Sequence, residues 1–183
     1  MIEAIRNRRS VFPAQYSDRP IPKETIESIL ESANWAPNHK KTEPWRFKVM
    51  TGEKKTELGQ FLSKKYEEVV SNPKRIKIKK LLENPPKAGA IVAICMQRDA
   101  TDSLPEWEEI AATSMAVQNM WLHCTELGIG AYWSSPGLIK YMDEFFDLQE
   151  GERCLGFFYM GYYDEAPPKV TRGPIAEKVE WLD

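Results

Sequence analysis

The stretch from Trp35 to Phe47, WAPNHKKTEPWRF, combines residue types that could hold a charged, flat ligand. Within thirteen residues it has one histidine and two adjacent lysines, together with two tryptophans and two prolines. The prolines exclude regular helix and favour extended backbone in the residues before them. Trp35, Trp45 and Phe47 are costly to leave in water, so we expect this loop to be packed down. A rigid aromatic and cationic loop suits a planar anionic ligand. This stretch alone predicts equally well a structural loop, in which the aromatic residues pack on the core and His39 and the lysines are solvated.

A second group of charged donors, Arg8 to Ser10, ends a short helix expected over residues 2–9. Two guanidinium groups and a hydroxyl can bind a phosphate through forked, charge-assisted hydrogen bonds. The alternative is an ordinary basic helix end, which the helix dipole favours. The tripeptide alone favours this alternative. We expect Ile2 and Ile5 to face inward from the helix.

Length and composition bound the kind of protein. The chain has 183 residues, which predicts one domain over residues 1–183 with a sizeable core. Its net charge of −2 gives no reason to expect a nucleic-acid partner. The longest apolar run, Ala88 to Met96, is too short to cross a bilayer, and the first residues lack the apolar core of a signal peptide. Cys95, Cys124 and Cys154 are widely spaced in apolar surroundings, which predicts reduced, buried thiols in a cytoplasmic protein and no metal site.

Hydrophobic periodicity predicts the elements that position these groups. Alternating or continuous apolar residues predict strands, and apolar residues spaced three and four apart predict amphipathic helices. The expected strands are 46–51, 88–96, 129–135 and 153–161. The expected longer helices are 22–34, 53–70 and 106–127, and a short helix is expected over 138–146. The stretch with the histidine and lysines therefore lies between a helix and a strand.

The segment 71–86 is the most polar part of the chain. It carries a basic cluster made of Lys74, Arg75, Lys77, Lys79 and Lys80, and Pro85 and Pro86 are expected to end it. Such a cluster could bind a phosphate or a lipid headgroup, but a solvated helix face is the favoured interpretation.

The helix expected over 106–127 and the C-terminal tail both predict uncovered apolar surface. The helix has apolar residues on more than one side, which is typical of a central helix or of a dimer interface. The tail after Gly161 has three prolines and is expected to be mostly extended. Trp181 and Leu182 at its end should pack on something, and another subunit is one candidate.

Several common catalytic motifs are absent from the sequence. There is no Walker loop, and Gly128-Ile129-Gly130 lacks the third glycine of a dinucleotide-binding turn and ends a helix instead of starting one. His123 and Cys124 are adjacent, but neighbouring helical residues do not face each other, so a structural histidine is favoured over a nucleophile pair.

Four motifs, in the right order over nearly the whole chain, make the sequence resemble the small single-domain subgroup of nitroreductase-family flavoproteins. The first is Arg8-Arg9-Ser10, which is weak on its own. The resemblance now favours a phosphate-binding role for these residues over an ordinary basic helix end. The second, fairly specific, is the A-P-[ND]-H-K…P-W-R-F block that begins at Ala36. The third is a long helix that runs into a glycine-rich turn and the strand with Trp133 and Ser134, and the fourth is a last core strand followed by a tail with Arg-x-Pro at Arg172.

The resemblance implies an α+β sandwich, with a central, mostly antiparallel sheet flanked by helices. It further implies a domain-swapped homodimer that associates through the long helix, with two FMN sites, each at the dimer interface, and the tail wrapped on the partner. Residues implied to contact FMN from one subunit are Arg8, Arg9, Ser10, Trp133, Ser134, Ser135 and Arg172; Trp35 and His39 are implied to come from the other subunit. A weaker correspondence implies NAD(P) contacts from His123, Cys124, Thr125, Glu126, Leu127 and Gly128.

The resemblance implies an FMN-dependent NAD(P)H oxidoreductase. It would transfer hydride in a ping-pong manner to a nitroaromatic, a quinone or a similar flat electrophile. No acid or base residue is required, because the flavin carries the redox chemistry. Alternatives on the same fold are a non-catalytic flavin carrier or sensor, and another flavin reaction such as dehalogenation or flavin fragmentation.

The chain departs from the family pattern at two positions. Trp35 and Ser134 stand where arginine is common, and each change removes a cation near the flavin. The departures bear on the charge of the substrate and on the choice between NADH and NADPH.

Overall fold

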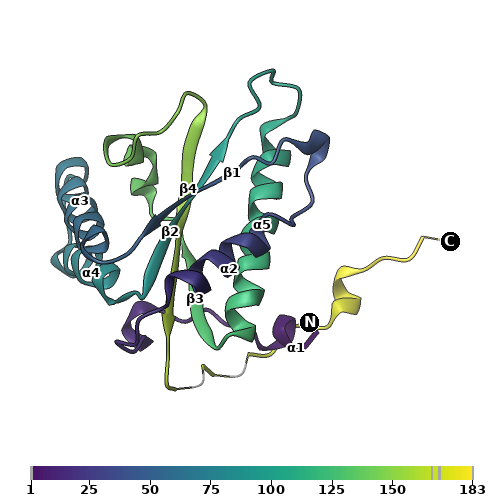
Figure 1. Ribbon diagram of the computed structural model, residues 1–183, viewed down its shortest axis with the longest axis horizontal. Coiled ribbons are helices and arrows are strands. Elements are labelled where there is room, and N and C mark those ends of the chain that lie inside the picture. Colours follow the sequence, from purple (N-terminus) through teal and green to yellow (C-terminus); the bar gives the residue numbers. More distant parts are fainter. Residues whose placement is uncertain (1, 166, 169, 183) are drawn as a thin grey trace.

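A computed structural model of the chain describes residues 2–165, 167–168 and 170–182. The α-helices are α1 (Ile2–Asn7), α2 (Lys23–Ala33), α3 (Glu53–Val69), α4 (Arg75–Lys87) and α5 (Glu106–Glu126). The strands are β1 (Trp45–Met50), β2 (Ala90–Gln97), β3 (Ile129–Ser134) and β4 (Glu152–Tyr162). Short 3-10 helices span Pro13–Gln15, His39–Lys41, Gly137–Glu144 and Ile175–Lys178. The fold is therefore α+β, as the resemblance implied (Figure 1).

The four strands form one sheet in the order β1-β2-β4-β3, and every neighbouring pair is antiparallel. β3 lies at an edge of this sheet, where backbone groups face away from the other strands. Part of that edge is covered, because Ser10 forms a parallel bridge with Ala131 and the Val11 N–H donates to the Ala131 carbonyl at 3.1 Å. The short segment after α1 is thereby fastened beside β3.

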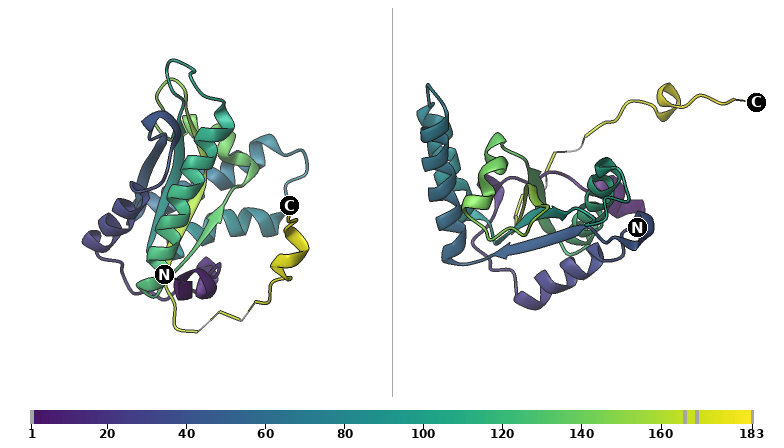
Figure 2. Two further views of the ribbon diagram at one scale, coloured as in Figure 1. Left: turned by 90° about the vertical axis from the view of Figure 1, so that its right-hand side faces the viewer. Right: turned by 90° about the horizontal axis from the view of Figure 1, so that it is seen from above.

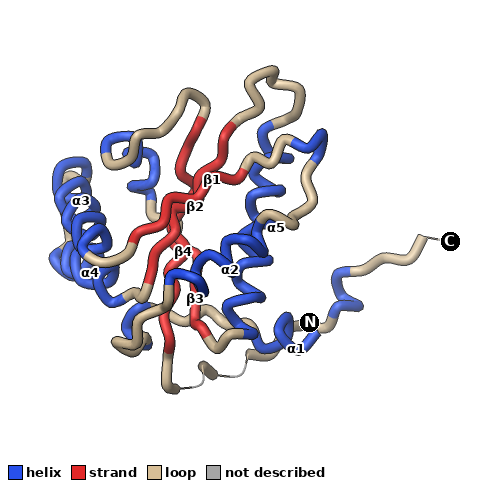
Figure 3. The backbone as a smooth tube through the Cα atoms, in the orientation of Figure 1, coloured by secondary structure: helices blue, strands red, loops and turns tan. Residues whose placement is uncertain are grey.

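Helices cover both faces of the sheet (Figures 1 and 2). Side chains of β2 alternate between the two cores: Val92 and Ile94 pack with α2 and α5, whereas Ile91 and Cys95 pack with α3, α4 and the 3-10 helix 137–144. All but the last residue of β2 are buried, which confirms the prediction of a strand covered on both sides. Figure 3 shows the sheet between the α3–α4 pair and the α2–α5 pair.

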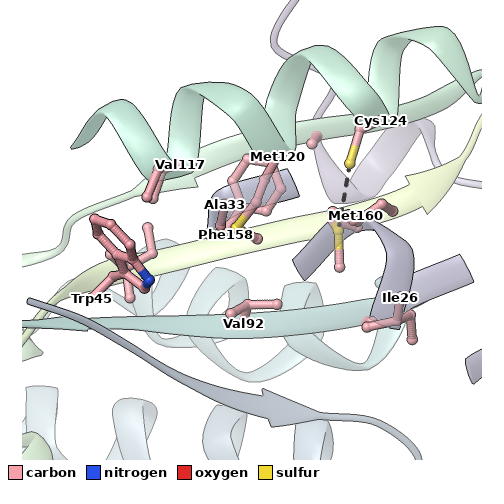
Figure 4. Packing of buried hydrophobic residues seen from close by; sticks show 14 of the residues in the cluster. Ile26, Ala33, Trp45, Val92, Val117, Met120, Cys124, Phe158 and Met160 are labelled. Atoms are coloured by element: carbon pink, nitrogen blue, oxygen red, sulfur yellow. Dashed lines mark hydrogen bonds between the residues drawn. The ribbon is translucent and has the colours of Figure 1, made fainter. Parts of the chain in front are cut away.

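The core between α5 and the sheet contains one of the three cysteines. The Cys124 sulfur lies 3.6 Å from the Met160 sulfur, between the helix and β4 (Figure 4). Cys95 and Cys154 are also buried and free, which confirms the expectation of buried thiols for all three. Burial raises the pKa of the Cys124 thiol, so this sulfur serves packing and not chemistry.

Apolar side chains remain uncovered on α5 and in the tail. Trp107 on α5 is exposed, and Trp181 and Leu182 are each 86% exposed at the end of a tail that leaves the body of the chain (Figure 1). The expected extended tail also includes Ala166 and Lys169, which lie outside the described residues. Exposed indole rings on separate segments favour a further contact surface.

Several expectations need correction. Ile2 and Ile5 are exposed, and Ala4 is the buried residue of α1, so the face of the helix that points inward is the one with Ala4. Trp35 is 79% exposed, whereas Trp45 is buried as expected. The segment after Pro136 forms a 3-10 helix instead of an α-helix. In the described part of the chain, no helix has both the length and the apolar character needed to cross a bilayer.

Candidate functional site

Three arginines from the two ends of the chain converge at one corner. The Arg8 guanidinium lies 4.6 Å above the Trp121 ring of α5. Burial lowers the pKa of Arg8, and the nearby positive charges of Arg172 and Arg9 lower its pKa further. None of the three forms an ion pair with a carboxylate of a described residue. Among the residues that the structure describes, the corner is thus a concentration of positive charge with no carboxylate paired to it.

Arg9 gives this corner an unsatisfied donor. Its Nη1 donates to the Arg6 carbonyl at 2.6 Å and to the Arg8 carbonyl at 2.8 Å, and these bonds fix the guanidinium against the end of α1. Its Nε is buried and has no hydrogen-bond partner. A buried donor without an acceptor costs roughly 1–3 kcal/mol, so an oxyanion at this corner would remove a penalty as well as balance charge.

The basic corner continues along the outer edge of β3, past the part that Ser10 and Val11 cover. Ser10 is held beside Ala131, and Trp133 and Ser134 follow on the same strand. Their side chains lie on opposite faces because they are neighbours in a strand. The Trp133 indole packs toward α2 and α5 and donates to the Leu155 carbonyl at 3.3 Å. Ser134 is half-buried and faces α4, and Ser135 follows it in an exposed position.

Lysines of α4 lie beside Ser134. Lys77, Lys80 and Asn84 line a cavity of about 130 Å³ together with Ser134 and Tyr132. Their spacing of three and four residues puts them on one face of the helix. The sequence interpretation treated this cluster as solvated, and Lys77, Lys79 and Lys80 are all exposed. Lys77 and Lys80 differ from Lys79 in that they line this cavity, whereas the Lys79 Nζ lies 3.8 Å from a Glu83 carboxylate oxygen. The 77–80–84 spacing was the pattern that could have separated the cavity-lining residues from the others.

His39 and Trp35 lie away from the basic corner of their own chain. His39 Nδ1 lies 2.6 Å from a Glu108 carboxylate oxygen near the start of α5, whereas Arg8 stacks on Trp121. These two positions on α5 are thirteen residues apart, which is about 20 Å along a helix. The Trp35 indole Nε1 donates a hydrogen bond to a Glu31 carboxylate oxygen at 3.2 Å. One chain does not bring its own histidine to its own arginines.

The segment His123–Gly128, which the resemblance links weakly to NAD(P), has mixed surroundings. Cys124 is fully buried, and the Thr125 hydroxyl donates to the Trp121 carbonyl at 2.9 Å. His123 and Glu126 line a cavity of about 360 Å³ that Trp35 also borders. Leu127 and Gly128 are exposed where α5 ends. The Cys124 side chain is buried, and the contacts of all six residues with NAD(P) stay predictions.

Comparison with known proteins identifies the family of this arrangement. The sequence profile described as the nitroreductase family matches residues 5–162. The chain belongs to the nitroreductase family. This is an oxidoreductase family, and the match includes the arginine corner up to Ser10, the block with His39 and the edge strand β3.

Relatives match this nitroreductase-family chain over most of their length. YfhC of Bacillus subtilis, provisionally named an NAD(P)H nitroreductase, is 34% identical over 182 residues, which are 96% of this chain and 91% of YfhC. YdjA of Escherichia coli K12, named in the same way, is 29% identical over 163 residues, or 87% of this chain and 86% of YdjA.

Solved structures share the fold of this nitroreductase-family chain. A nitroreductase-like family protein from Bacillus cereus has a TM-score of 0.86 and 30% identity, over 100% of this chain and 95% of that one. A nitroreductase described in complex with FMN from Desulfovibrio desulfuricans has a TM-score of 0.75 and 22% identity, over 100% of this chain and 96% of its own.

Proposed function

We propose that two copies of this chain, each forming one domain, make an FMN-dependent NAD(P)H oxidoreductase that reduces flat electrophilic acceptors. The observation that carries the proposal is the arginine corner with its unsatisfied Arg9 Nε at the start of an open strand edge. Membership of the nitroreductase family, and relatives named after NAD(P)H, support the reaction class.

The corner suits the phosphate of FMN. A phosphate monoester carries about two negative charges at neutral pH, by analogy with phosphorylated side chains. Arg8, Arg9 and Arg172 would neutralise these charges through short, charge-assisted hydrogen bonds, and the Ser10 hydroxyl would add a neutral one. Burial and the neighbouring arginine charges lower the pKa of Arg8, and a bound phosphate would offset both by favouring its charged form. The Desulfovibrio structure is named for an FMN complex, which supports this choice of ligand.

The ring of the cofactor would lie along β3 toward Ser134. Trp133 provides an aromatic wall that the bond to Leu155 holds in place, and Ser134 and Ser135 provide hydroxyls. FMN, when bound, supplies the hydride-transfer chemistry, while the chain positions and shields it. Lys77 and Lys80 would stabilise negative charge that develops at the ring end of the site. They would replace the cation that the family pattern commonly has at position 134.

A second copy would complete each site with its Trp35 and His39. The separation of about 20 Å along α5 supports this arrangement, since a single chain leaves its histidine far from its arginines. Glu108 would hold the imidazole of the donor copy in a fixed orientation. The exposed Trp107, Trp181 and Leu182 supply apolar area for a dimer in which the tails exchange.

Donor and acceptor would use one open face of the ring in turn, which makes the kinetics ping-pong. Acceptors in this proposal are nitroaromatics, quinones and similar flat electrophiles. His123, Glu126 and the end of α5 would contribute to the nicotinamide-dinucleotide site. A cytoplasmic location belongs to the proposal and is supported by three buried, free cysteines, since such thiols persist in a reducing compartment.

The purified protein should be yellow, and either NADPH or NADH should bleach its flavin absorbance in the absence of air. Adding an acceptor such as menadione should then restore the colour, because oxidation of the bound flavin is the second half of the cycle. Absorbance at the flavin band, recorded after each addition, measures both halves. Colour that persists with both nicotinamides would contradict the reductase function, and a protein that binds no FMN would contradict the cofactor assignment.

A further inference from the structure

A second cavity adjoins the one that contains Ser134. It has a volume of about 310 Å³ and lies between the end of α3, the start of α4 and the 3-10 helix 137–144. Both cavities are lined by Lys77 and Pro136, so they share a wall at these two residues. Neither the family match nor the residues that the resemblance implies account for this second space.

The lining of this second cavity suits an aromatic ring. Tyr66 and Tyr141 provide flat surfaces, and Val69, Leu138 and Pro136 make the remaining wall apolar. A volume of about 310 Å³ lies at the lower end of the range for small-molecule sites, which is enough for one substituted ring. Its position next to Ser134 puts such a ring beside the proposed flavin ring.

Two lysines give the cavity a positive charge. Lys77 and Lys140 line it, and neither forms an ion pair with a carboxylate of a described residue. Lys140 lies with its Nζ 4.9 Å from the centre of the Tyr141 ring, so its charge is held against the aromatic wall. The neighbouring Lys65 is different, because Glu68 and Glu144 accept from it at 2.8 and 2.6 Å. The two cavity lysines are therefore available to a ligand.

We infer that this cavity is the acceptor site and that it selects flat aromatic acceptors carrying a carboxylate. The inference rests on the proposed function and deepens it. The ring would pack against Tyr66 and Tyr141, the carboxylate would bind Lys140, and the reducible group would point past Lys77 toward Ser134. For a nitro group the reaction is ArNO2 + NAD(P)H + H⁺ → ArNO + NAD(P)⁺ + H2O. The nicotinamide is oxidised by two electrons and the nitro nitrogen is reduced by two.

The inference is tested with a matched pair of acceptors on the FMN-loaded protein. The probes are 4-nitrobenzoate and the neutral 4-nitrobenzamide, and kcat/KM is measured for each with the wild type and with Lys140→Gln. Removing one hydrogen bond to a charged group should lower kcat/KM for 4-nitrobenzoate about tenfold more than that for 4-nitrobenzamide. Comparing each probe with itself on two proteins removes the effect of its intrinsic reactivity.

Two more variants test whether the charge at position 140 causes the preference. Lys140→Glu should lower kcat/KM for 4-nitrobenzoate further and raise that for the cationic 4-nitrobenzyltrimethylammonium. Lys79→Gln removes the same charge from α4 at a residue outside the cavity, and it should change neither preference. The loss for 4-nitrobenzoate should also shrink as salt is added, because screening weakens the wild-type attraction.

The inference is overturned if Lys140→Gln lowers kcat/KM equally for the two acceptors, or if it lowers kcat/KM for neither. This outcome is distinct from failure of the proposed function, which would show as a flavin that NADPH and NADH do not bleach. Even then, calorimetric binding of 4-nitrobenzoate to the FMN-loaded wild type and to Lys140→Gln decides the matter. Weaker binding only in the variant supports the carboxylate site, and equal binding or no binding overturns it.

Discussion

The substitution Arg8→Met is expected to weaken FMN binding about 100-fold, because it removes a forked, charge-assisted contact to the phosphate worth about 2–3 kcal/mol. Methionine keeps an apolar chain against the Trp121 ring, so the local packing survives. The apoprotein should be at least as stable as the wild type. The lowered pKa of Arg8 means that the fold disfavours its charged form, and removing the charge relieves that cost. Fluorescence titration of FMN and thermal melting of the apoprotein measure the two effects.

Arg6→Met is the matched control for Arg8→Met. It removes the same charge from the same helix, at an exposed side chain that has no part in the proposed phosphate site. Its affinity for FMN should stay near that of the wild type. Equal losses in the two variants would show that overall charge, and not the arginine corner, governs binding, and the corner would then lose its assigned role.

A methyl group at Gly156 should damage both the fold and the flavin site. Gly156 has φ +150°, and a Cβ placed there would lie 2.2 Å from Trp133 Nε1 and 2.7 Å from the Ser134 carbonyl oxygen. The added methyl group would displace Trp133 and Ser134, the two residues of β3 that are proposed to border the flavin ring. We expect Gly156→Ala to cost about 3 kcal/mol from strain and overpacking combined. For a chain of this length the loss corresponds to a fall of about 10 °C in Tm.

Two comparisons test the cause of that loss. Gly137→Ala adds a methyl group where no atom lies within 4 Å, so its Tm should hardly change. The double variant Trp133→Ala/Gly156→Ala should lose less stability than the sum of the two single variants, because the indole is no longer there to clash with the added methyl group. A Gly156→Ala protein that melts at the wild-type temperature would mean that β3 and β4 are not packed as described.

The elements that depend on local pattern could be predicted from the sequence. The continuous apolar run of β2 predicted a strand buried on both faces, and the spacing of small and apolar residues predicted α5 to within one residue at its C-terminal end. These predictions succeed because side-chain periodicity follows directly from strand and helix geometry. Residues 138–146 carried a helical pattern as well, but the segment forms a tighter 3-10 helix that starts after Pro136.

The candidate site could be predicted only in part, because its members are distant in the chain. Motifs singled out Arg8 and Arg172, but periodicity cannot show that charges so far apart in the sequence lie close together. The contribution of Lys77 was missed because the first half of its helix carries several basic residues, and only the cavity shared with Ser134 separates it from Lys79. Trp35 was expected to be packed because it is large and apolar, yet the single chain leaves it exposed. In the proposed dimer, the second copy covers the Trp35 side chain.

The shared site is tested most directly with a dimer of two different chains. One chain carries Arg8→Met and the other carries Trp35→Ala with His39→Ala, each with its own affinity tag, and FMN per dimer is measured after purification by both tags in turn. If each site uses arginines from one copy and the loop of its mate, one site holds all three substitutions and the other is intact. The mixed dimer should then retain about half of the wild-type FMN, while each variant alone retains little. A mixed dimer that binds no more FMN than the two variants alone would show that each site lies within one chain, which contradicts the account.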